Sequence, residues 1–232
     1  MSAPNAAARS LKKVSCGLSI GRRQFVALAG GAVLCQIGRA DTLPPAIPRD
    51  GIGFSVWRNG SEIGTHSVSF QRDNDWLSVR SEANFSIRFG PITVYRYHYQ
   101  ALEIWRGEHL ILVRAQTDDN GNIEHVDASR SGDSLIVSGS KSGRYTAPAS
   151  AIAATHWNQA ELDQPMINPQ NGELMRFDRR EVGLERLNSG IEARHVALTG
   201  YASLDLWYDE AKRWSALRAI ATDGSIIDYH LR

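Results

Sequence analysis

The sequence predicts an all-β protein, in which a curved antiparallel meander forms an open or half β-barrel with one short inserted helix or loop. Tight-turn dipeptides such as Asn59-Gly60 and Asn120-Gly121 recur roughly every 12 to 17 residues. Between them, apolar and polar residues alternate with the period of two of a half-buried strand. One stretch, residues 148–171, lacks this alternation and contains two prolines after an alanine-rich run. So many strands in one sheet must curl, and the interruption is expected to lie against the concave face.

Residues 1–40 have the pattern of an export signal rather than of a folded element. This stretch contains six basic residues and no acidic residue, and it includes an uncharged run from Phe25 to Ile37. At 13 residues, the run is too short to span a bilayer. Small residues at Gly38 and Ala40 predict cleavage between Ala40 and Asp41.

The pair Arg22-Arg23, followed by the hydrophobic Phe25, resembles the twin-arginine export motif, although two neighbouring positions depart from the usual pattern. This resemblance implies recognition by the twin-arginine export machinery and a periplasmic or secreted location. An ordinary secretory signal and lipid attachment at Cys35 are the alternatives. Whether the signal is cleaved or retained as an anchor stays open.

Without residues 1–40 the chain contains no cysteine, and its acidic residues outnumber its basic ones. Disulfides, thiolate catalysis and zinc–thiolate sites are therefore excluded. A mildly acidic chain also lacks the clustered basic surface that nucleic-acid binding requires. We interpret 41–50 as a proline-rich linker and 51–232 as a single β-barrel-like domain.

Within this domain, Trp76–Phe89 is the clearest strand, because Leu77, Val79, Ala83 and further apolar residues fall on one face while polar residues fall on the other. Similar alternation predicts strands, in chain order, at Phe54–Arg58, Glu62–Gln71, Ile92–Trp105, Leu110–Thr117, Ile123–Arg130, Leu135–Ser138, Leu174–Arg179, Arg194–Thr199, Leu204–Tyr208, Trp214–Ala221 and Ile226–Leu231.

The interruption begins with Ala149–Ala154, whose composition favours a short helix. Pro165 and Pro169 then break any regular structure. We expect a short helix followed by a long loop.

The strand Ile92–Trp105 is the first candidate for ligand binding. Its aromatic residues Tyr95, Tyr97, Tyr99 and Trp105 share one face, and the other face carries a polar row that includes Arg96 and His98. Aromatic residues with a few convergent polar groups are the usual lining of a ligand pocket. Cross-strand packing of the aromatic rings is the alternative explanation.

The second candidate is His156-Trp157-Asn158 in the inserted segment, because loops on a rigid sheet often hold functional residues. Alternatively, Trp157 anchors the loop to the sheet, and the two polar residues pair with backbone groups.

No catalytic or cofactor motif occurs in the sequence: it has no serine elbow, phosphate-binding glycine loop, dinucleotide fingerprint or zinc-protease helix. The seven histidines are scattered singly, with no pair at metal-ligand spacing on one element. We therefore expect no metal, no cofactor and no catalytic residue, although catalysis stays an open question.

Several short segments of the chain are distinctive. They are Tyr97-His98-Tyr99, Glu103-Ile104-Trp105-Arg106-Gly107, Thr155-His156-Trp157-Asn158, Ile167-Asn168, Asn171-Gly172-Glu173-Leu174, Leu206-Trp207-Tyr208-Asp209 and Asp223-Gly224-Ser225-Ile226-Ile227-Asp228-Tyr229. In these residues the chain resembles a family of exported proteobacterial proteins of unknown function. The resemblance covers nearly all of the chain after the export signal and supplies no activity or catalytic residue.

A more distant likeness, of architecture alone, is to the open β-barrels of periplasmic lipoprotein carriers, whose concave face holds acyl chains. The leading hypothesis is a non-catalytic periplasmic binding or carrier protein for a hydrophobic or amphipathic ligand. The alternatives are a module that binds a protein partner of the cell envelope, and a hydrolase whose site is assembled from scattered His, Asp and Arg residues. The ligand or substrate, the oligomeric state and the reason for folded export are left open.

Overall fold

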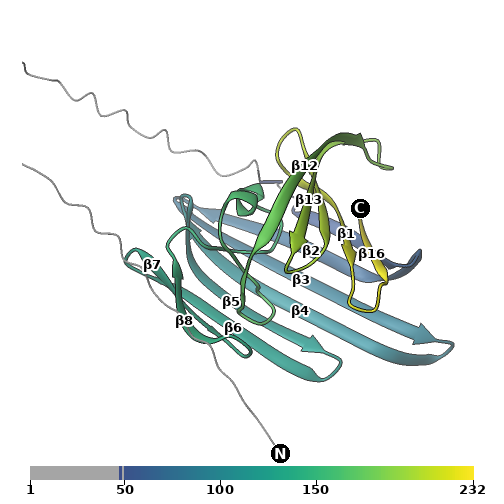
Figure 1. Cartoon of the computed structure of the whole chain (residues 1–232), viewed down its shortest axis with the longest axis horizontal. Helices are drawn as coiled ribbons and strands as arrows, with labels where there is room; N and C mark the ends of the chain where they lie inside the picture. Colours follow the sequence, from purple (N-terminus) through teal and green to yellow (C-terminus); the bar gives the residue numbers. More distant parts are fainter. Residues whose placement is uncertain (1–46, 49) are drawn as a thin grey trace, which may run out of the picture. The chain divides into compact units, whose positions relative to one another are not determined.

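The structure is a computed structural model that describes residues 47, 48 and 50–232. Most of this part of the chain is β-structure, arranged as one 13-stranded sheet and one three-stranded sheet (Figure 1). The predicted export signal, with Arg22-Arg23 and its cleavage site, lies outside the described residues. Within them, no helix has the length and apolar character that a membrane span requires.

The large sheet is antiparallel throughout, and most of its strands follow one another as the alternation predicted. The strand Gly143–Pro148 was not predicted, and the predicted strand Leu174–Arg179 is divided between Leu174–Met175 of the small sheet and Phe177–Arg186 of the large sheet. The strands of the large sheet are β1 (Ile52–Arg58), β2 (Ser61–Asp73), β3 (Trp76–Phe89), β4 (Ile92–Arg106), β5 (His109–Asp119), β6 (Asn122–Ser131), β7 (Ser134–Gly139), β8 (Gly143–Pro148), β12 (Phe177–Arg186), β13 (Glu192–Gly200), β14 (Leu204–Asp209), β15 (Trp214–Ile220) and β16 (Ile226–Leu231).

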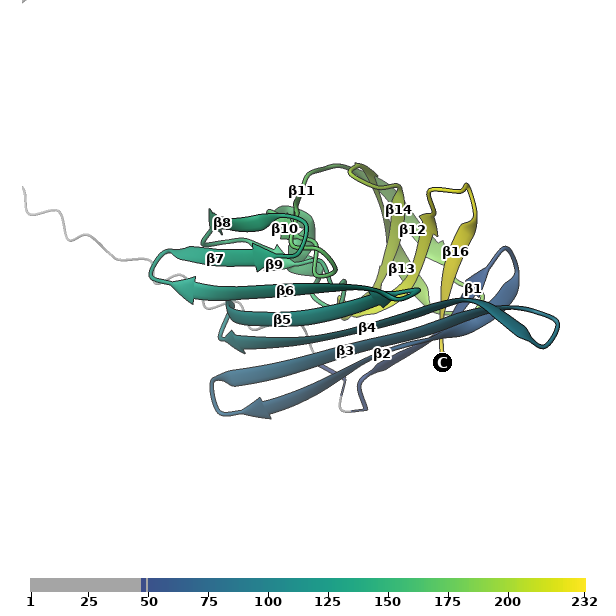
Figure 2. The same ribbon diagram turned by 90° about the horizontal axis from the view of Figure 1, so that it is seen from below.

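The strand order runs from β12 to β16 and then from β1 to β8, so the last strand pairs with the first and two free edges remain. Phe54 of β1 pairs with Leu231 of β16, for example. Figure 2 shows the sheet curving so that β13, β14 and β16 rise away from β2–β6. The predicted all-β open barrel is confirmed, because the edge strands β8 and β12 do not pair with each other.

The predicted hairpin turns are present where Asn-Gly dipeptides occur. Asn59 and Gly60 adopt φ values of 48° and 81°, and Asn120 and Gly121 adopt 53° and 95°. Two consecutive positive φ values are what a tight two-residue hairpin requires, and Asn-Gly is the pair that tolerates them best.

The inserted segment, which in the structure extends over residues 149–176, connects the two edge strands β8 and β12 along the chain. It contains β9 (Ile152–Ala153), a 3₁₀ helix η1 (Gln159–Asp163), β10 (Met166–Ile167) and β11 (Leu174–Met175), with β9, β10 and β11 forming the small sheet. On one side Tyr145 of β8 donates its hydroxyl to the Gly172 carbonyl at 2.8 Å. On the other, Arg179 of β12 donates to the Asp163 carboxylate of η1, and the side-chain amide of Asn168 donates to the Tyr201 hydroxyl at 3.1 Å. The segment thus bridges the opening that β8 and β12 leave.

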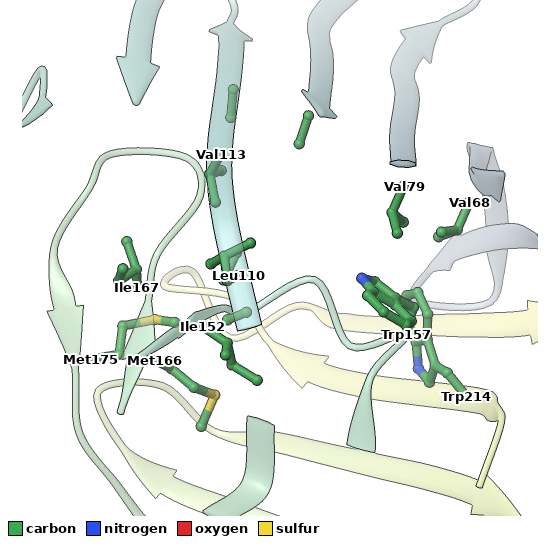
Figure 3. Close-up of a cluster of buried hydrophobic side chains, with 14 of the residues drawn as sticks. Val68, Val79, Leu110, Val113, Ile152, Trp157, Met166, Ile167, Met175 and Trp214 are labelled. Atoms are coloured by element: carbon green, nitrogen blue, oxygen red, sulfur yellow. The ribbon is translucent and has the colours of Figure 1, made fainter. Parts of the chain in front are cut away.

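The core lies between the inserted segment and the inner face of the large sheet (Figure 3). Apolar side chains of β2, β3 and β5 face those of β9, β10 and β11. Trp157 packs edge-on against Phe70 and Trp105, at 5.5 Å between ring centroids in each pair. The inserted segment therefore covers the concave apolar surface, as predicted.

The helix predicted at Ala149–Ala154 is wrong. The Ile152 N–H donates to the Pro165 carbonyl and the Ala154 N–H donates to the Ile167 carbonyl, both at 3.0 Å, so the run is extended and Ile152–Ala153 forms β9. All residues from Ala151 to Ala154 are buried. Small side chains here permit close packing, and this tertiary contact overrides the intrinsic helix propensity of alanine.

The far end of the β3–β4 hairpin leaves the core. The inner-face residues of β3 are buried up to Ala83, whereas Phe89 at the tip is 80% exposed and Ile92 is 63% exposed. The pairing of β3 with β4 nevertheless continues from Trp76 to Phe89. The predicted strand is thus confirmed over its full length, although only its first half is half-buried.

Candidate binding pocket

A cavity of about 760 Å³ opens on the inner face of the large sheet, between β2–β4, β14–β16 and the His156 loop. This volume falls within the range of small-molecule sites. The lining is mainly aromatic and aliphatic, with a few charged groups. It consists of Arg58, Ile63, His66, Ala83, Phe85, Ile87, Val94, Tyr95, Tyr97, Tyr99, Asp119, Ala154, Thr155, His156, Pro169, Gln170, Leu204, Leu217, Ala219, Ala221, Thr222, Asp223, Ile227 and Tyr229.

Strand β4 supplies the aromatic wall of this pocket. Its alternation puts Tyr95, Tyr97 and Tyr99 on one face, and in the structure this face is the inner one. Tyr97 stacks on its cross-strand partner Phe85 with ring centroids 5.1 Å apart. Burial raises the pKa of Tyr97 and of Tyr99 far above the usual value, so both hydroxyls stay protonated.

His66 of β2 is the most unusual residue of the pocket wall. The residue is 7% exposed, and neither ring nitrogen has a hydrogen-bond partner within the described structure. Its ring contacts Trp214 and Tyr229 edge-on, at 5.4 and 5.6 Å between centroids. Burial, reinforced by His156, lowers the pKa of His66 to about 3, so the imidazole is neutral. The neighbouring Tyr99 hydroxyl also has no partner among the described residues.

The sequence interpretation missed His66, although a signal was present. His66, Val68 and Phe70 occupy alternate positions of β2, so the histidine lies on the face that its neighbours make apolar. A histidine on the apolar face of a strand is a polar group placed where burial is expected.

His156 reaches the pocket from the inserted segment, and its ring contacts Trp214, as that of His66 does. Its Nδ1 atom lies 2.6 Å from Oε1 of Glu161, and its backbone N–H donates to Oε2 at 3.0 Å. The Tyr208 hydroxyl donates to Oε1 at 3.2 Å. Glu161 is fully buried, and His156 has a φ of 65°, which is uncommon for a non-glycine residue. Three hydrogen bonds therefore fix the carboxylate that orients the imidazole.

Trp105 and Trp157 belong to a buried hydrogen-bonded cluster centred on Glu103. Oε1 of Glu103 accepts from the Thr155 hydroxyl at 2.7 Å and from Trp157 Nε1 at 3.0 Å, while Oε2 accepts from Trp105 Nε1 at 2.9 Å. Burial raises the pKa of Glu103 to about 7, against the lowering effect of these three hydrogen bonds. The cluster ties β4 to the inserted segment.

The predicted ligand-binding residues thus fall into three groups. Tyr97, Tyr99 and His156 line the pocket. Trp105, Trp157 and Asn158 instead line a separate cavity of about 690 Å³ beyond the tryptophan pair. Asn158 also caps η1, where its Oδ1 accepts from the Ala160 N–H at 3.1 Å.

Arg96 and His98 form the third group, on the exposed outer face of β4. The Nε2 atom of His98 lies 3.7 Å from Oε1 of Glu82 on the neighbouring strand. Their place on the face away from the pocket follows from the strand period of two, because Tyr97 and Tyr99 take the inner positions. The polar row therefore points to solvent and does not converge with the aromatic residues.

No group of three or more His, Cys, Asp or Glu side chains suited to hold a metal ion occurs among the described residues. The histidines of the pocket either lack a partner or pair with a single carboxylate. The arrangement can surround an elongated apolar molecule and offer it a few fixed polar groups.

A family model described as a domain of unknown function, DUF6134, matches residues 54–232, and the chain therefore belongs to this family. No curated protein matches the chain. Among solved structures, it is similar to a β-barrel-like protein of a domain of unknown function, DUF1849, from Brucella abortus. The two share 9% sequence identity, with 82% of this chain and 96% of that chain covered and a TM-score of 0.56. At this identity the likeness shows the fold alone.

Proposed function

We propose that this member of the DUF6134 family is a non-catalytic binding or carrier protein for an amphipathic ligand, exported by the twin-arginine route to the periplasm. The apolar part of the ligand lies along Tyr97, Phe85 and the aliphatic residues of β15. Its polar part meets the histidines of the inner wall. The size and aromatic lining of the pocket support this proposal.

The observation that carries the proposal is the unpartnered imidazole of His66. A buried polar group without a partner costs about 1–3 kcal/mol of folding free energy. Unpaired buried polar groups call for a specific explanation, such as a role other than stability. A ligand that hydrogen-bonds to His66 would explain why this imidazole has no partner in the protein.

The test is the intact mass of the exported protein under native and then denaturing conditions. We expect an added mass that denaturation releases. The substitution Ala219→Trp should abolish the added mass, because Ala219 lines the pocket. The control substitution Ile220→Trp should leave the added mass unchanged, because the Ile220 side chain is on the outer face and 56% exposed. A bare mass for the unmodified protein contradicts the proposal.

The His156–Glu161 pair favours a second candidate, a hydrolase in which His156 acts as general base on a bound water. A carboxylate that holds Nδ1 leaves Nε2 free to accept a proton. The measurement is hydrolysis of chromogenic esters of increasing acyl length. Turnover that is lost in His156→Gln but kept in His98→Gln favours the hydrolase. An absence of turnover in the unmodified protein contradicts it.

A further inference from the structure

The charged groups that line the pocket leave no described arginine or lysine unpaired. Among the described lining residues, Arg58 is the one Lys or Arg, and its guanidinium is hydrogen-bonded to the Asp223 carboxylate. Asp119 accepts a hydrogen bond from the Tyr95 hydroxyl. No described lysine or arginine of the pocket is therefore left to balance an anionic ligand.

The two histidines of the pocket do not supply a net positive charge either. His156 is bound to Glu161, so the pair has a net charge of zero or minus one in either protonation state of the imidazole. His66 is neutral, because burial lowers its pKa to about 3. A neutral imidazole offers one N–H donor and one bare nitrogen acceptor.

We propose that the polar end of the ligand is uncharged, a hydroxyl or carbonyl group received by His66 beside Tyr99. This inference rests on the proposed function and names its ligand class. A hydroxyl pairs with either ring nitrogen of His66, and a carbonyl accepts its N–H. The rings of His66 and Tyr99 lie 6.4 Å apart at 78°, so both residues belong to one region of the wall. Their unpartnered polar atoms are buried in the ligand-free structure, so the ligand reaches them when these rings turn.

Charged ends are disfavoured by the same geometry. A carboxylate or phosphate placed against His66 would be buried without a cation. An ammonium placed there would also lack a nearby partner, because His66 is on β2 and Asp119, the lining carboxylate without a cation, is on β5. Burying an unpaired charge costs far more than burying a hydrogen-bonded neutral group. The pocket therefore selects against fatty acids and for neutral amphipaths of similar length.

The test uses three probes of one chain length, 1-decanol, decanoate and decylammonium, titrated into the exported protein at pH 7.5 by calorimetry. We expect decanol to bind at least tenfold more tightly than either charged probe. A smaller preference, or a preference for a charged probe, overturns the inference while leaving the binding function intact. If none of the three binds, the proposed function itself fails.

Three variants test which side chain binds the polar end of the ligand. His66→Phe should weaken decanol binding at least fivefold and change decanoate binding less than twofold. Tyr99→Phe, a milder change, should weaken decanol binding alone. His98→Phe is the matched control, because it makes the same substitution at a histidine on the exposed outer face. It should leave all three affinities unchanged. Unaltered decanol affinity in the His66 variant overturns the assignment of His66.

Discussion

Glu103 and His66 are both buried polar residues on the inner face of one sheet, but their surroundings differ completely. Glu103 accepts hydrogen bonds from three side chains, two of which come from the inserted segment. His66 has none among the described residues, although aromatic rings surround it. The protein therefore supplies side-chain hydrogen bonds to one buried polar group, Glu103, and supplies none from its described residues to the other, His66. The region around Glu103 attaches the inserted segment to the sheet, whereas the region around His66 leaves hydrogen-bonding groups for a ligand.

The largest effect should follow from removing Glu103. Glu103→Ala leaves the donors of Thr155, Trp157 and Trp105 unpaired in a dry core. Each such loss costs about 1–3 kcal/mol, and we expect the free energy of unfolding to fall by about 3–5 kcal/mol in all. Urea denaturation measures it. A loss below about 1 kcal/mol would mean that the cluster does not hold the inserted segment.

His66→Phe should change the free energy of unfolding in the opposite direction. The substitution removes two unsatisfied nitrogens and keeps an aromatic ring, so we expect the ligand-free protein to become more stable by about 1 kcal/mol. Thermal unfolding of delipidated protein measures the gain, with His98→Phe as the control. Destabilisation by a similar amount would indicate that His66 is a structural residue.

Glu103 and His66 should also affect the pH dependence of stability in opposite directions. Because the pKa of Glu103 is raised to about 7 in the folded protein, its contribution to stability is lost as pH rises from about 4.5 to 7. The pKa of His66 is lowered to about 3, so its contribution is lost as pH falls from about 6.5 towards 3.

Glu103→Gln and His66→Phe separate the two effects. Relative to the unmodified protein, the glutamine variant should gain stability with rising pH, and the phenylalanine variant should gain with falling pH. Over these full pH ranges, each change in the free energy of unfolding is of the order of 3–5 kcal/mol. Parallel pH profiles for all three proteins would contradict the protonation states given to both residues.

The smallest effect is expected on the outer face. Arg96→Ser removes an exposed side chain of β4 that lies away from the pocket. We expect stability to change by less than about 0.5 kcal/mol and decanol affinity to stay within twofold. A tenfold loss of affinity would place the ligand on the outer face and reverse the assignment of the pocket.

Local properties of the sequence were enough to predict most of the sheet. Alternation determines which side chains share a face, so the spacing alone put Tyr97 and Tyr99 together. It did not distinguish the inner face from the outer one, and Arg96 and His98 therefore stayed among the candidates. The donors to Glu103 come from Thr155 and Trp157, far along the chain, and no local pattern reports that contact. The helix predicted at Ala149–Ala154 failed for the same reason, because burial of the alanines depends on distant strands.

The pairing of β1 with β16 also has a consequence for synthesis. Phe54 takes Leu231 as its partner, so the sheet reaches its final strand order only after β16 has been synthesised. Contacts between residues so distant in the chain form slowly, since a long loop must close first. The edge of β1 that pairs with β16 therefore stays unpaired during synthesis of the strands between them.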